Sequence, residues 1–256
     1  MRKLPIGVAI FALLFIYCTQ AIAQSRGYYD APYTRYEADA GTGNGTIITN
    51  FSQANIAYEA SERTCVYLSN GQSREWITSS AFRGIVVRAS GASSQTATSG
   101  QSVLAKLFID NIQVATLTFD PSWGWKKLDD GNNNYSGTSN RNPRMRYDEQ
   151  RYLHSSTVTA GKKIKIESQG NLYLDFIEIE DVPPPIPSPA GYKQYTGNGS
   201  DLQAWLNNNS GNIYIPAGNY NIGGCINIGS RIIQGAGMWY TNLNWTTTGT
   251  SNSGFV

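Results

Sequence analysis

The chain has 256 residues, with 20 Lys or Arg, 18 Asp or Glu and a formal net charge of +2 at pH 7. Two of the basic residues, Arg2 and Lys3, lie in front of an apolar N-terminal segment, so the rest of the chain carries 18 basic and 18 acidic side chains. This balance and the absence of a basic patch exclude nucleic acid as an expected partner. Uncharged Asn, Ser, Thr, Gly and Tyr dominate the polar residues, which favours an uncharged partner.

The N-terminal segment has the three parts of a secretory signal peptide. Arg2 and Lys3 form the basic start, residues 6–17 are almost entirely apolar, and Ala21-Ile22-Ala23 is a small-x-small cleavage site. The apolar run is too short to cross a bilayer as a stable helix. We therefore expect cleavage after Ala23 and a secreted mature chain that begins at Gln24, with no membrane partner. A membrane anchor is the alternative.

A proline-rich stretch divides the remaining sequence. Residues 182–189 read Val-Pro-Pro-Pro-Ile-Pro-Ser-Pro, which can form neither a helix nor a central strand. Such a run acts as a stiff, extended spacer. The sequence therefore predicts a signal peptide at 1–23, a first domain at 24–181, a linker at 182–190 and a second domain at 191–256.

The first domain has the pattern of an all-β protein. Its short apolar or alternating stretches lie at 81–89, 103–109, 112–119, 163–167 and 172–180. Turn residues such as Asp110-Asn111 separate them, and no stretch before the linker has a helical period. Short strands with turn residues between them predict a β-sandwich of the jelly-roll type.

After the linker the predicted strands become shorter and closer together. One short helix is expected over 201–206, with Ser200 as its N-cap. Strands of three or four residues follow at 213–215, 220–222, 225–228 and 231–234, with Gly, Asn and Pro between them. This succession suits a parallel β-helix, in which each rung stacks on the last. A solenoid needs about three or more coils to bury its core, and roughly two are visible, so we expect a truncated β-helix and favour a fragment.

A tryptophan-containing loop is the strongest candidate for ligand binding. Trp123 and Trp125 flank Gly124, and a long Asn- and Gly-rich loop follows at 130–142. Sugars are bound largely by aromatic faces that stack on the ring, with a few polar groups for orientation. The alternative is that both tryptophans are buried in a core, as Trp often is.

A second candidate is the run Arg146-Tyr147-Asp148-Glu149, followed by Gln150 and Arg151. Acids beside arginine can orient sugar hydroxyls through charge-assisted hydrogen bonds, so we predict ligand contacts by the four residues of this run. Two carboxylates are also the minimum for glycoside hydrolysis. Neighbouring residues of a strand point to opposite faces, however, so Asp148 and Glu149 are not expected to flank one glycosidic bond. A structural ion pair with Arg146 or Arg151 is the alternative.

Three further acids could share a cation. Glu37 and Asp39 alternate along the first strand, and Asp175 lies in the last strand of the first domain. Calcium takes several oxygen ligands, so we predict a structural Ca²⁺ held by these three residues. Solvated surface carboxylates are the alternative.

The remaining reactive residue types indicate little chemistry. His154 is the only histidine, which excludes a His-based zinc site or triad as an expectation and favours a surface or hydrogen-bonded role. Cys65 and Cys225 survive cleavage, and export permits a disulfide, although two separate thiols are equally compatible with the sequence. Cys65 has no base partner that would make it a nucleophile.

Several motifs resemble known carbohydrate-active families. Tyr36-Glu37-Ala38-Asp39 and Leu174-Asp175-Phe176-Ile177-Glu178-Ile179 resemble the opening and closing strands of family 6 and family 35 carbohydrate-binding modules, which are calcium-containing β-sandwiches. Trp123-Gly124-Trp125, Tyr147-Asp148-Glu149 and Ala160-Gly161-Lys162-Lys163-Ile164 resemble the sandwich domain that precedes the β-helix in bacterial α-1,3-glucanases (mutanases and mycodextranases). Residues 213–220 and 233–241 resemble the first rungs of their right-handed parallel β-helix.

The resemblance implies an all-β chain, a jelly-roll sandwich followed by the first β-helix rungs. It also implies that an α-glucan is the polysaccharide partner. The family hydrolyses α-1,3-glucan with aspartates on later rungs, so no catalytic residue is carried over to this sequence. We expect the N-terminal part of a glycoside hydrolase. The alternatives are a non-catalytic polysaccharide-binding module, and a fragment of a β-helix lyase or adhesin.

Overall fold

The computed structural model describes residues 31–52, 55–92, 101–120, 147–246 and 254–255. The regular elements of the described chain are strands apart from one α-helix and two short 3-10 helices, so the all-β prediction is confirmed. Among the described residues no helix is long and apolar enough to cross a bilayer. The predicted signal peptide lies outside the described residues.

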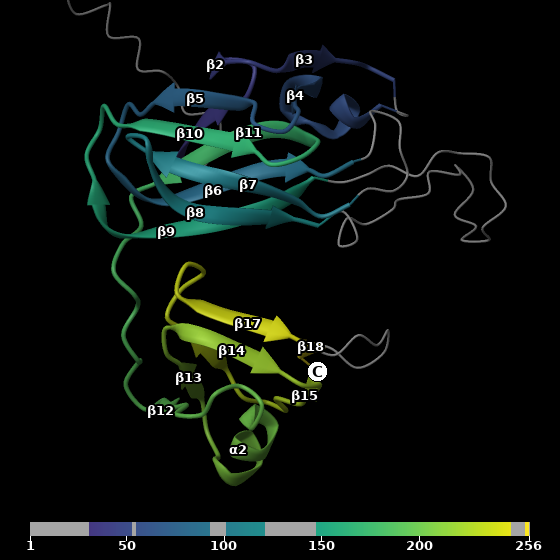
Figure 1. Ribbon diagram of the computed structural model, residues 1–256. Coiled ribbons are helices and arrows are strands. Elements are labelled where there is room, and N and C mark those ends of the chain that lie inside the picture. The colour runs from purple at the N-terminus through teal and green to yellow at the C-terminus, as the bar shows by residue number, and fades with distance from the viewer. Residues whose placement is uncertain (1–30, 53–54, 93–100, 121–146, 247–253, 256) are drawn as a thin grey trace, which may run out of the picture. The chain divides into compact units, whose positions relative to one another are not determined.

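Two antiparallel sheets form a sandwich (Figure 1). The six-stranded sheet has the order β3 (Thr46–Thr49), β4 (Thr64–Leu68), β11 (Leu172–Glu180), β6 (Phe82–Ser90) and β9 (Asp148–Val158), and β1 (Tyr33–Glu37) pairs with β11. The five-stranded sheet has the order β2 (Thr42–Gly43), β5 (Ser73–Ile77), β10 (Lys163–Ser168), β7 (Val103–Ile109) and β8 (Ile112–Phe119). The five strands predicted before the linker are all present, at closely similar bounds.

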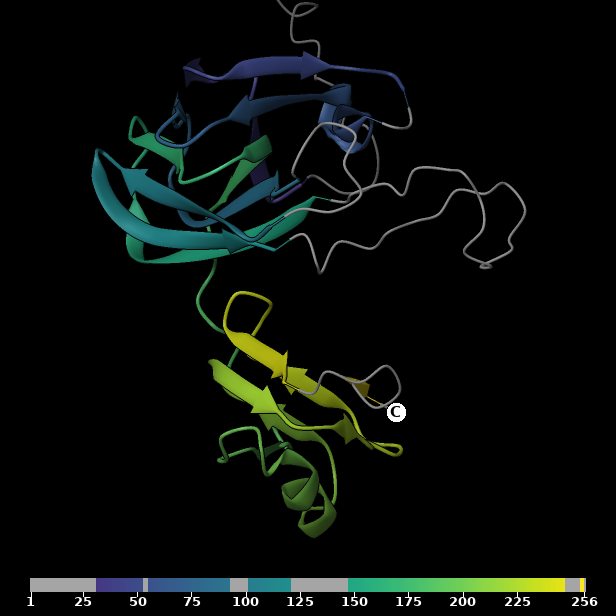
Figure 2. The same cartoon turned by 45° about the vertical axis from the view of Figure 1, so that its right-hand side comes forward.

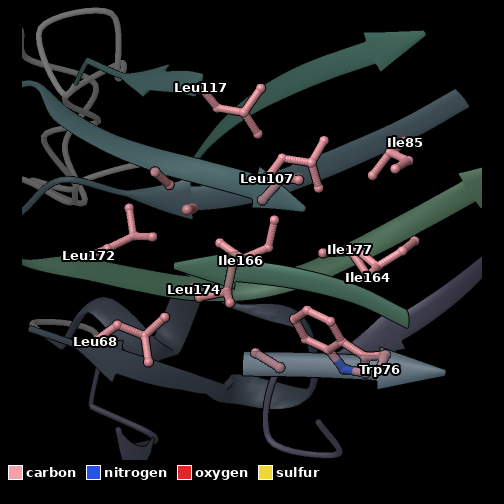
Figure 3. Packing of buried hydrophobic residues seen from close by; sticks show 14 of the residues in the cluster. Leu68, Trp76, Ile85, Leu107, Leu117, Ile164, Ile166, Leu172, Leu174 and Ile177 are labelled. Carbon is pink, nitrogen blue, oxygen red and sulfur yellow. The ribbon is translucent and has the colours of Figure 1, made fainter. Parts of the chain in front are cut away.

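The core of the sandwich lies between the two sheets, where alternate residues of each strand meet (Figure 3). Ile85 and Val87 of β6 face Leu107 of β7 and Ile166 of β10, and all four are fully buried. The side chains between them in sequence point away from this core, as the period of two requires. Each fully buried aliphatic side chain contributes about 1.5–3 kcal/mol, so this interior dominates the stability of the sandwich.

A tight turn closes the β7–β8 hairpin at Asp110-Asn111, as the sequence predicts. Both residues have positive φ, 46° and 66°, a conformation that Asp and Asn tolerate better than most residues. Asp110 also accepts hydrogen bonds from the backbone N–H of Lys163 and the Nζ of Lys162, which tie the turn to β10.

After the sandwich the chain forms a parallel coil. Its elements are β12 (Lys193–Gln194), α2 (Leu202–Asn208), β13 (Ile213–Ile215), β14 (Gly218–Ile222), β15 (Cys225–Ile226), β16 (Ile233–Gly235), β17 (Thr241–Trp245) and β18 (Gly254–Phe255). Strand β16 lies parallel to β13, β17 to β14 and β18 to β15, so each of these three pairs with the strand three places earlier, and β13 also pairs in parallel with β12. The predicted succession of short strands is present, and the strands pair in parallel.

The short helix differs slightly from its prediction. Helix α2 begins at Leu202, with Asp201 rather than Ser200 at its N-cap, and no side-chain cap hydrogen bond forms. Leu202 and Leu206 are fully buried because they lie four residues apart, on one face of the helix. They pack into the interior of the coil together with Ile213 and Ile222.

The coil interior opens into an apolar hollow of about 410 Å³. It is lined by Ile215, Ile228, Ile233, Gly235, Gly237, Met238, Thr241, Leu243 and Phe255. Met238 is 62% exposed and Phe255 41% exposed, which is high for side chains of this size. The described strands therefore do not fully cover the apolar interior that they create.

The proline-rich stretch has neither helix nor strand, as expected. It is anchored to the coil, because the N–H of Ile186 donates to the carbonyl of Ala236 and the hydroxyl of Tyr214 donates to the carbonyl of Ile186. These bonds limit the freedom that a simple spacer would have.

Candidate functional site

The segment between β3 and β4 covers part of the outer face of the six-stranded sheet, the face turned away from the sandwich core. It contains the 3-10 helices η1 (Ile56–Glu59) and η2 (Ser61–Arg63), which the sequence did not reveal. Asn55 caps η1 through its Oδ1, which accepts from the N–H of Ala57 at 2.9 Å. The segment buries a second apolar cluster, made of Ile48, Ile56, Ala57, Ala60, Cys65, Ala92, Tyr147 and Tyr173.

Arg88 lies at the margin of this segment and holds it to the sheet. Its Nη1 donates to Oδ2 of Asp175, and both Nη atoms lie 3.3 Å from the carbonyl of Glu59. The guanidinium also lies over the rings of Tyr147 (4.7 Å) and Phe176 (5.6 Å). Charge-assisted and cation–π contacts together therefore link β6, β11 and Tyr147, the residue before β9, to the η1 segment.

A β-bulge places Asp175 in this arrangement. Leu174 pairs with Ala89 and Phe176 with Arg88, so Asp175 is an extra residue in the β11 ladder. Bulges commonly re-aim a side chain next to a functional site. Asp175 is fully buried, and its Oδ1 accepts from the N–H of Ser61 at 2.8 Å.

The three predicted calcium ligands are only partly brought together. Ser61 joins two of them, because its N–H donates to Asp175 and its hydroxyl donates to Oε1 of Glu37 at 2.9 Å. The Arg88 guanidinium already neutralises Asp175, and both carboxylate oxygens are engaged. Within the described ranges no group of three or more His, Cys, Asp or Glu, and hence none that includes Asp39, is placed to hold a metal ion. This donor set does not fit Ca²⁺, which needs several free oxygens.

Burial shifts the protonation of the two acids in the same direction. Desolvation raises the pKa of Asp175 to about 6, although Arg88 and the Ser61 N–H favour its charged form. Desolvation also raises the pKa of Glu37, against its hydrogen bond from Ser61. Shifted carboxylates often mark active sites, but Asp175 is inaccessible to a substrate, so its role here is structural.

Beyond the η1 segment, the outer face of the six-stranded sheet carries charged side chains whose exposure ranges from 13% at Glu178 to 51% at Glu149. Arg35 of β1 donates from Nε to Oε1 of Glu178 at 2.9 Å, and its guanidinium lies 3.9 Å over the Phe176 ring. Glu149 of β9 pairs in register with Arg88, and its side chain is 51% exposed. We call Arg35, Glu178, Arg88, Glu149 and Arg151 the charged strip.

The residues predicted to bind ligand have different positions. Glu149 lies on the charged strip, and Asp148 accepts from the side chain of Gln150 and the N–H of Glu149. Tyr147 is only 8% exposed, and its hydroxyl donates to the carbonyl of Ile56 at 3.3 Å, so its ring is not available for stacking on a sugar. Trp123, Trp125 and Arg146 lie outside the described residues.

The coil contributes almost no acid–base chemistry. Residues 191–256 contain one acid, Asp201, and its Oδ1 accepts from the hydroxyl of Tyr195. That hydroxyl also accepts from the N–H of Gly199 at 2.7 Å. Because glycoside hydrolysis ordinarily uses two carboxylates, this part of the coil does not supply a catalytic pair by itself.

The thiols and the histidine have no catalytic arrangement. Cys65 and Cys225 are both free, and burial raises the pKa of Cys65 to about 11, which leaves the thiol protonated and unreactive. Ring atom Nδ1 of His154 lies 2.8 Å from the carbonyl of Ser156, in agreement with the hydrogen-bonded role expected from the sequence.

Sequence reasoning missed the residue that organises the site. Arg88 falls inside the apolar run 81–89, and a charged residue at an outward position of such a strand was a usable signal. Its partner Glu59 and the Ser61 that bonds Asp175 lie in a segment with no regular pattern, so only the folded chain reveals them.

Comparisons with known proteins agree with this architecture. The family model described as alpha-1,3-glucanase catalytic domain D1 matches residues 30–182, more than half of the chain. No curated protein matches the sequence. Among solved structures, the Agl-KA catalytic domain is 25% identical with a TM-score of 0.74, over 88% of this chain and 44% of that chain.

Two further solved structures are similar. A GH87 alpha-1,3-glucanase catalytic domain, in an Asp-to-Ala variant in complex with tetrasaccharides, is 27% identical with a TM-score of 0.67 over 84% of this chain and 41% of that one. The catalytic unit of a thermostable GH87 alpha-1,3-glucanase from Streptomyces thermodiastaticus strain HF3-3 is 25% identical with a TM-score of 0.68, at the same coverages. The chain thus spans less than half the length of the solved chains that it matches.

The matched residues 30–182 include β1 to β11, the charged strip and the Arg88 network. This chain belongs to the alpha-1,3-glucanase catalytic domain D1 family.

Proposed function

We propose that this chain is the exported, substrate-holding front part of a glycoside hydrolase that acts on α-1,3-glucan. The observation that carries the proposal is the family match over the whole sandwich, together with solved relatives that are described as α-1,3-glucanase catalytic domains, one of them in complex with tetrasaccharides. The signal-peptide pattern at residues 1–23 supports export.

In this proposal the sandwich and the coil form one glucan-binding scaffold, and the coil is the beginning of a parallel β-helix. The exposed Glu149 on the charged strip can orient sugar hydroxyls through charge-assisted hydrogen bonds. Trp123 and Trp125 supply the flat apolar faces that sugar rings require. Hydrolysis by the whole enzyme then depends on carboxylates other than Asp201, which Tyr195 already engages.

Adsorption to insoluble α-1,3-glucan tests the proposal. We expect saturable binding by the full chain, and roughly tenfold weaker binding for Trp123→Ala, Trp125→Ala or both, which corresponds to about 1.4 kcal/mol. Ile77→Ala is the matched control, because Ile77 is a 60% exposed apolar residue on β5. Absence of binding by the wild-type chain, or an equal loss in the control, contradicts the proposal.

The same preparation tests the hydrolytic part. The chain alone should release no reducing sugar from α-1,3-glucan, because its coil offers a single carboxylate. Turnover by the chain alone would show that a carboxylate pair in the sandwich performs the reaction. A non-catalytic binding role predicts the same adsorption, so only an activity assay of a protein that spans the full length of the solved relatives separates the two.

A further inference from the structure

Four asparagines form a regular array on one side of the coil. Strands β14 and β17 lie parallel and side by side (Figure 2), with Asn219 in register with Asn242 and Asn221 in register with Asn244. All four are exposed, whereas Tyr220 and Ile222, between and beyond them on β14, are buried. The pleat of the strands therefore turns the apolar side chains inward and the four amides outward.

The spacing of the array follows from the sheet. Neighbouring strands lie about 4.8 Å apart, and alternate residues of one strand lie roughly 6.6 Å apart. The four amides thus occupy the corners of a small, nearly flat rectangle, which we call the asparagine array.

The amides are oriented and yet retain hydrogen-bonding capacity. Nδ2 of Asn242 donates to Oδ1 of Asn219 at 3.0 Å, which fixes the direction of both groups. An amide has two donors and an acceptor oxygen with two lone pairs, so this bond leaves both a donor and acceptor capacity on each partner. Sugar hydroxyls both donate and accept, and an oriented amide can serve two of them at once.

The backbone beneath the array is held at both ends. At one end the hydroxyl of Thr241 lies 3.1 and 3.0 Å from the carbonyls of Ile215 and Pro216, and it accepts from the N–H of Ala236 at 2.8 Å. At the other end the N–H of Thr246 donates to the carbonyl of Ile222 at 2.9 Å. Rigid support of this kind lowers the entropy cost of binding.

Asparagine is an unfavourable residue for strands β14 and β17 themselves. Asparagine is depleted in β-strands, whereas threonine would suit an exposed sheet position better. The surroundings are also nearly uncharged, since Lys193, Asp201 and Arg231 are the only charged residues of 191–256. An exposed neutral amide surface on a rigid sheet is complementary to an uncharged, hydroxyl-rich polymer.

We propose that the asparagine array is a binding site for a neutral polysaccharide, an α-glucan chain lying across β14 and β17. The site deepens the proposed function and rests on it, because the family supplies the class of ligand. It shares no residue with the charged strip or with the pair Trp123 and Trp125, so the two proposed glucan contacts can be tested with separate variants.

The test uses the full chain and insoluble α-1,3-glucan. Asn219→Ala with Asn242→Ala, and separately Asn221→Ala with Asn244→Ala, should each weaken adsorption about tenfold at an unchanged melting temperature. The pair Asn219→Thr with Asn242→Thr removes the amides while favouring the strand, so it keeps the test valid if the alanine pairs do not fold. Asn207→Ala with Asn208→Ala is the matched control, since both residues are exposed on α2.

The outcomes separate this inference from the proposed function. If the wild-type chain adsorbs and the array variants adsorb equally well, the array proposal is overturned and the proposed function is retained. Lower melting temperatures with unchanged adsorption also overturn it, because the amides would then serve only to stack the strands. A wild-type chain that does not adsorb contradicts both.

Discussion

The sandwich and the coil use polar residues in opposite ways. In the sandwich, charges are buried or half-buried in pairs, and Arg88 with Asp175 fixes the η1 segment to the sheet. In the coil, only three residues of 191–256 are charged, and the exposed face of β14 and β17 displays neutral amides. The comparison teaches that the buried charges of the sandwich are structural, whereas the exposed face of β14 and β17 is neutral and polar.

The two regions also differ in how completely they bury their interior. The two sheets of the sandwich cover each other, and residues such as Leu107 and Ile166 are fully buried. The coil leaves an apolar hollow of about 410 Å³, with exposed Met238 at its rim. The sandwich should therefore be the more stable region, and it is where single substitutions should have the largest effect on folding.

The largest expected effect comes from breaking the buried pair. Arg88→Met should lower the free energy of unfolding by about 3–5 kcal/mol, because it leaves the carboxylate of Asp175 buried without a counter-charge. Equilibrium urea unfolding measures this. Lys162→Met is the control, since Lys162 and Asp110 are about 40% exposed and such a surface pair contributes roughly 0–1 kcal/mol. A loss for Arg88→Met as small as that of the control would remove the structural role given to this charge.

The second effect is a pH dependence of the same pair. The pKa of Asp175 is raised to about 6 from its ordinary 3.8, so the stability linked to its protonation is present below about pH 4 and is lost as pH rises through 6. The stability advantage of the wild-type chain over Asp175→Asn should accordingly shrink by up to about 3 kcal/mol between pH 4 and pH 7. Unfolding of both proteins at each pH gives the difference. An advantage that grows over this interval would mean that Arg88 lowers the pKa instead.

The third effect concerns the support of the asparagine array. Gly199 has a φ of 106°, and a Cβ there would lie 2.6 Å from the backbone N of Asn221. Gly199→Ala should therefore lower the free energy of unfolding by about 2–4 kcal/mol, which is more than the penalty of the positive φ alone. Gly211→Ala separates the two causes, because Gly211 has a φ of 90° with nothing within 4 Å of the added carbon. Equal melting temperatures for the two variants would show that the loop at Gly199 does not press on β14.

The smallest expected effect follows from the poor fit of calcium. Adding Ca²⁺ should produce the same shift in melting temperature in the wild-type chain and in Glu37→Gln, because Ser61 and Arg88 engage both oxygens of Asp175 and Ser61 engages Oε1 of Glu37. Differential scanning fluorimetry with calcium or a chelator measures the shift. A calcium stabilisation that disappears in Glu37→Gln would restore the metal site that the resemblance implies.

Alternation of apolar residues accounts for most of the fold that could be predicted. Strands such as β7 and β10 bury every second residue, so the sequence itself carries the period of two. Strand β9 has the sequence DEQRYLHSSTV and little buried surface, so no apolar period marks it. The 3-10 helices η1 and η2 were not predicted, because neither the Asn55 cap nor the positive φ of Glu62 follows from a recognisable sequence pattern.

The site was less predictable because its contacts join distant segments. The sequence singled out Glu37, Glu149 and Asp175, but it assigned them to separate calcium and ligand sites. The folded chain joins Glu149 and Asp175 through Arg88, and Asp175 and Glu37 through Ser61. The η1 segment covers Tyr147, so its ring is buried rather than exposed on the surface. No local sequence pattern predicts this burial.

The most direct test of the account is a pair of adsorption isotherms for the full chain, one on α-1,3-glucan and one on an acidic polysaccharide such as polygalacturonate. The account predicts saturable binding to the neutral glucan and no retention on the acidic polymer at pH 7, because the proposed contacts are with uncharged hydroxyls. Preferential binding to the acidic polymer, or binding to neither, would contradict the claim that this chain holds a neutral α-glucan.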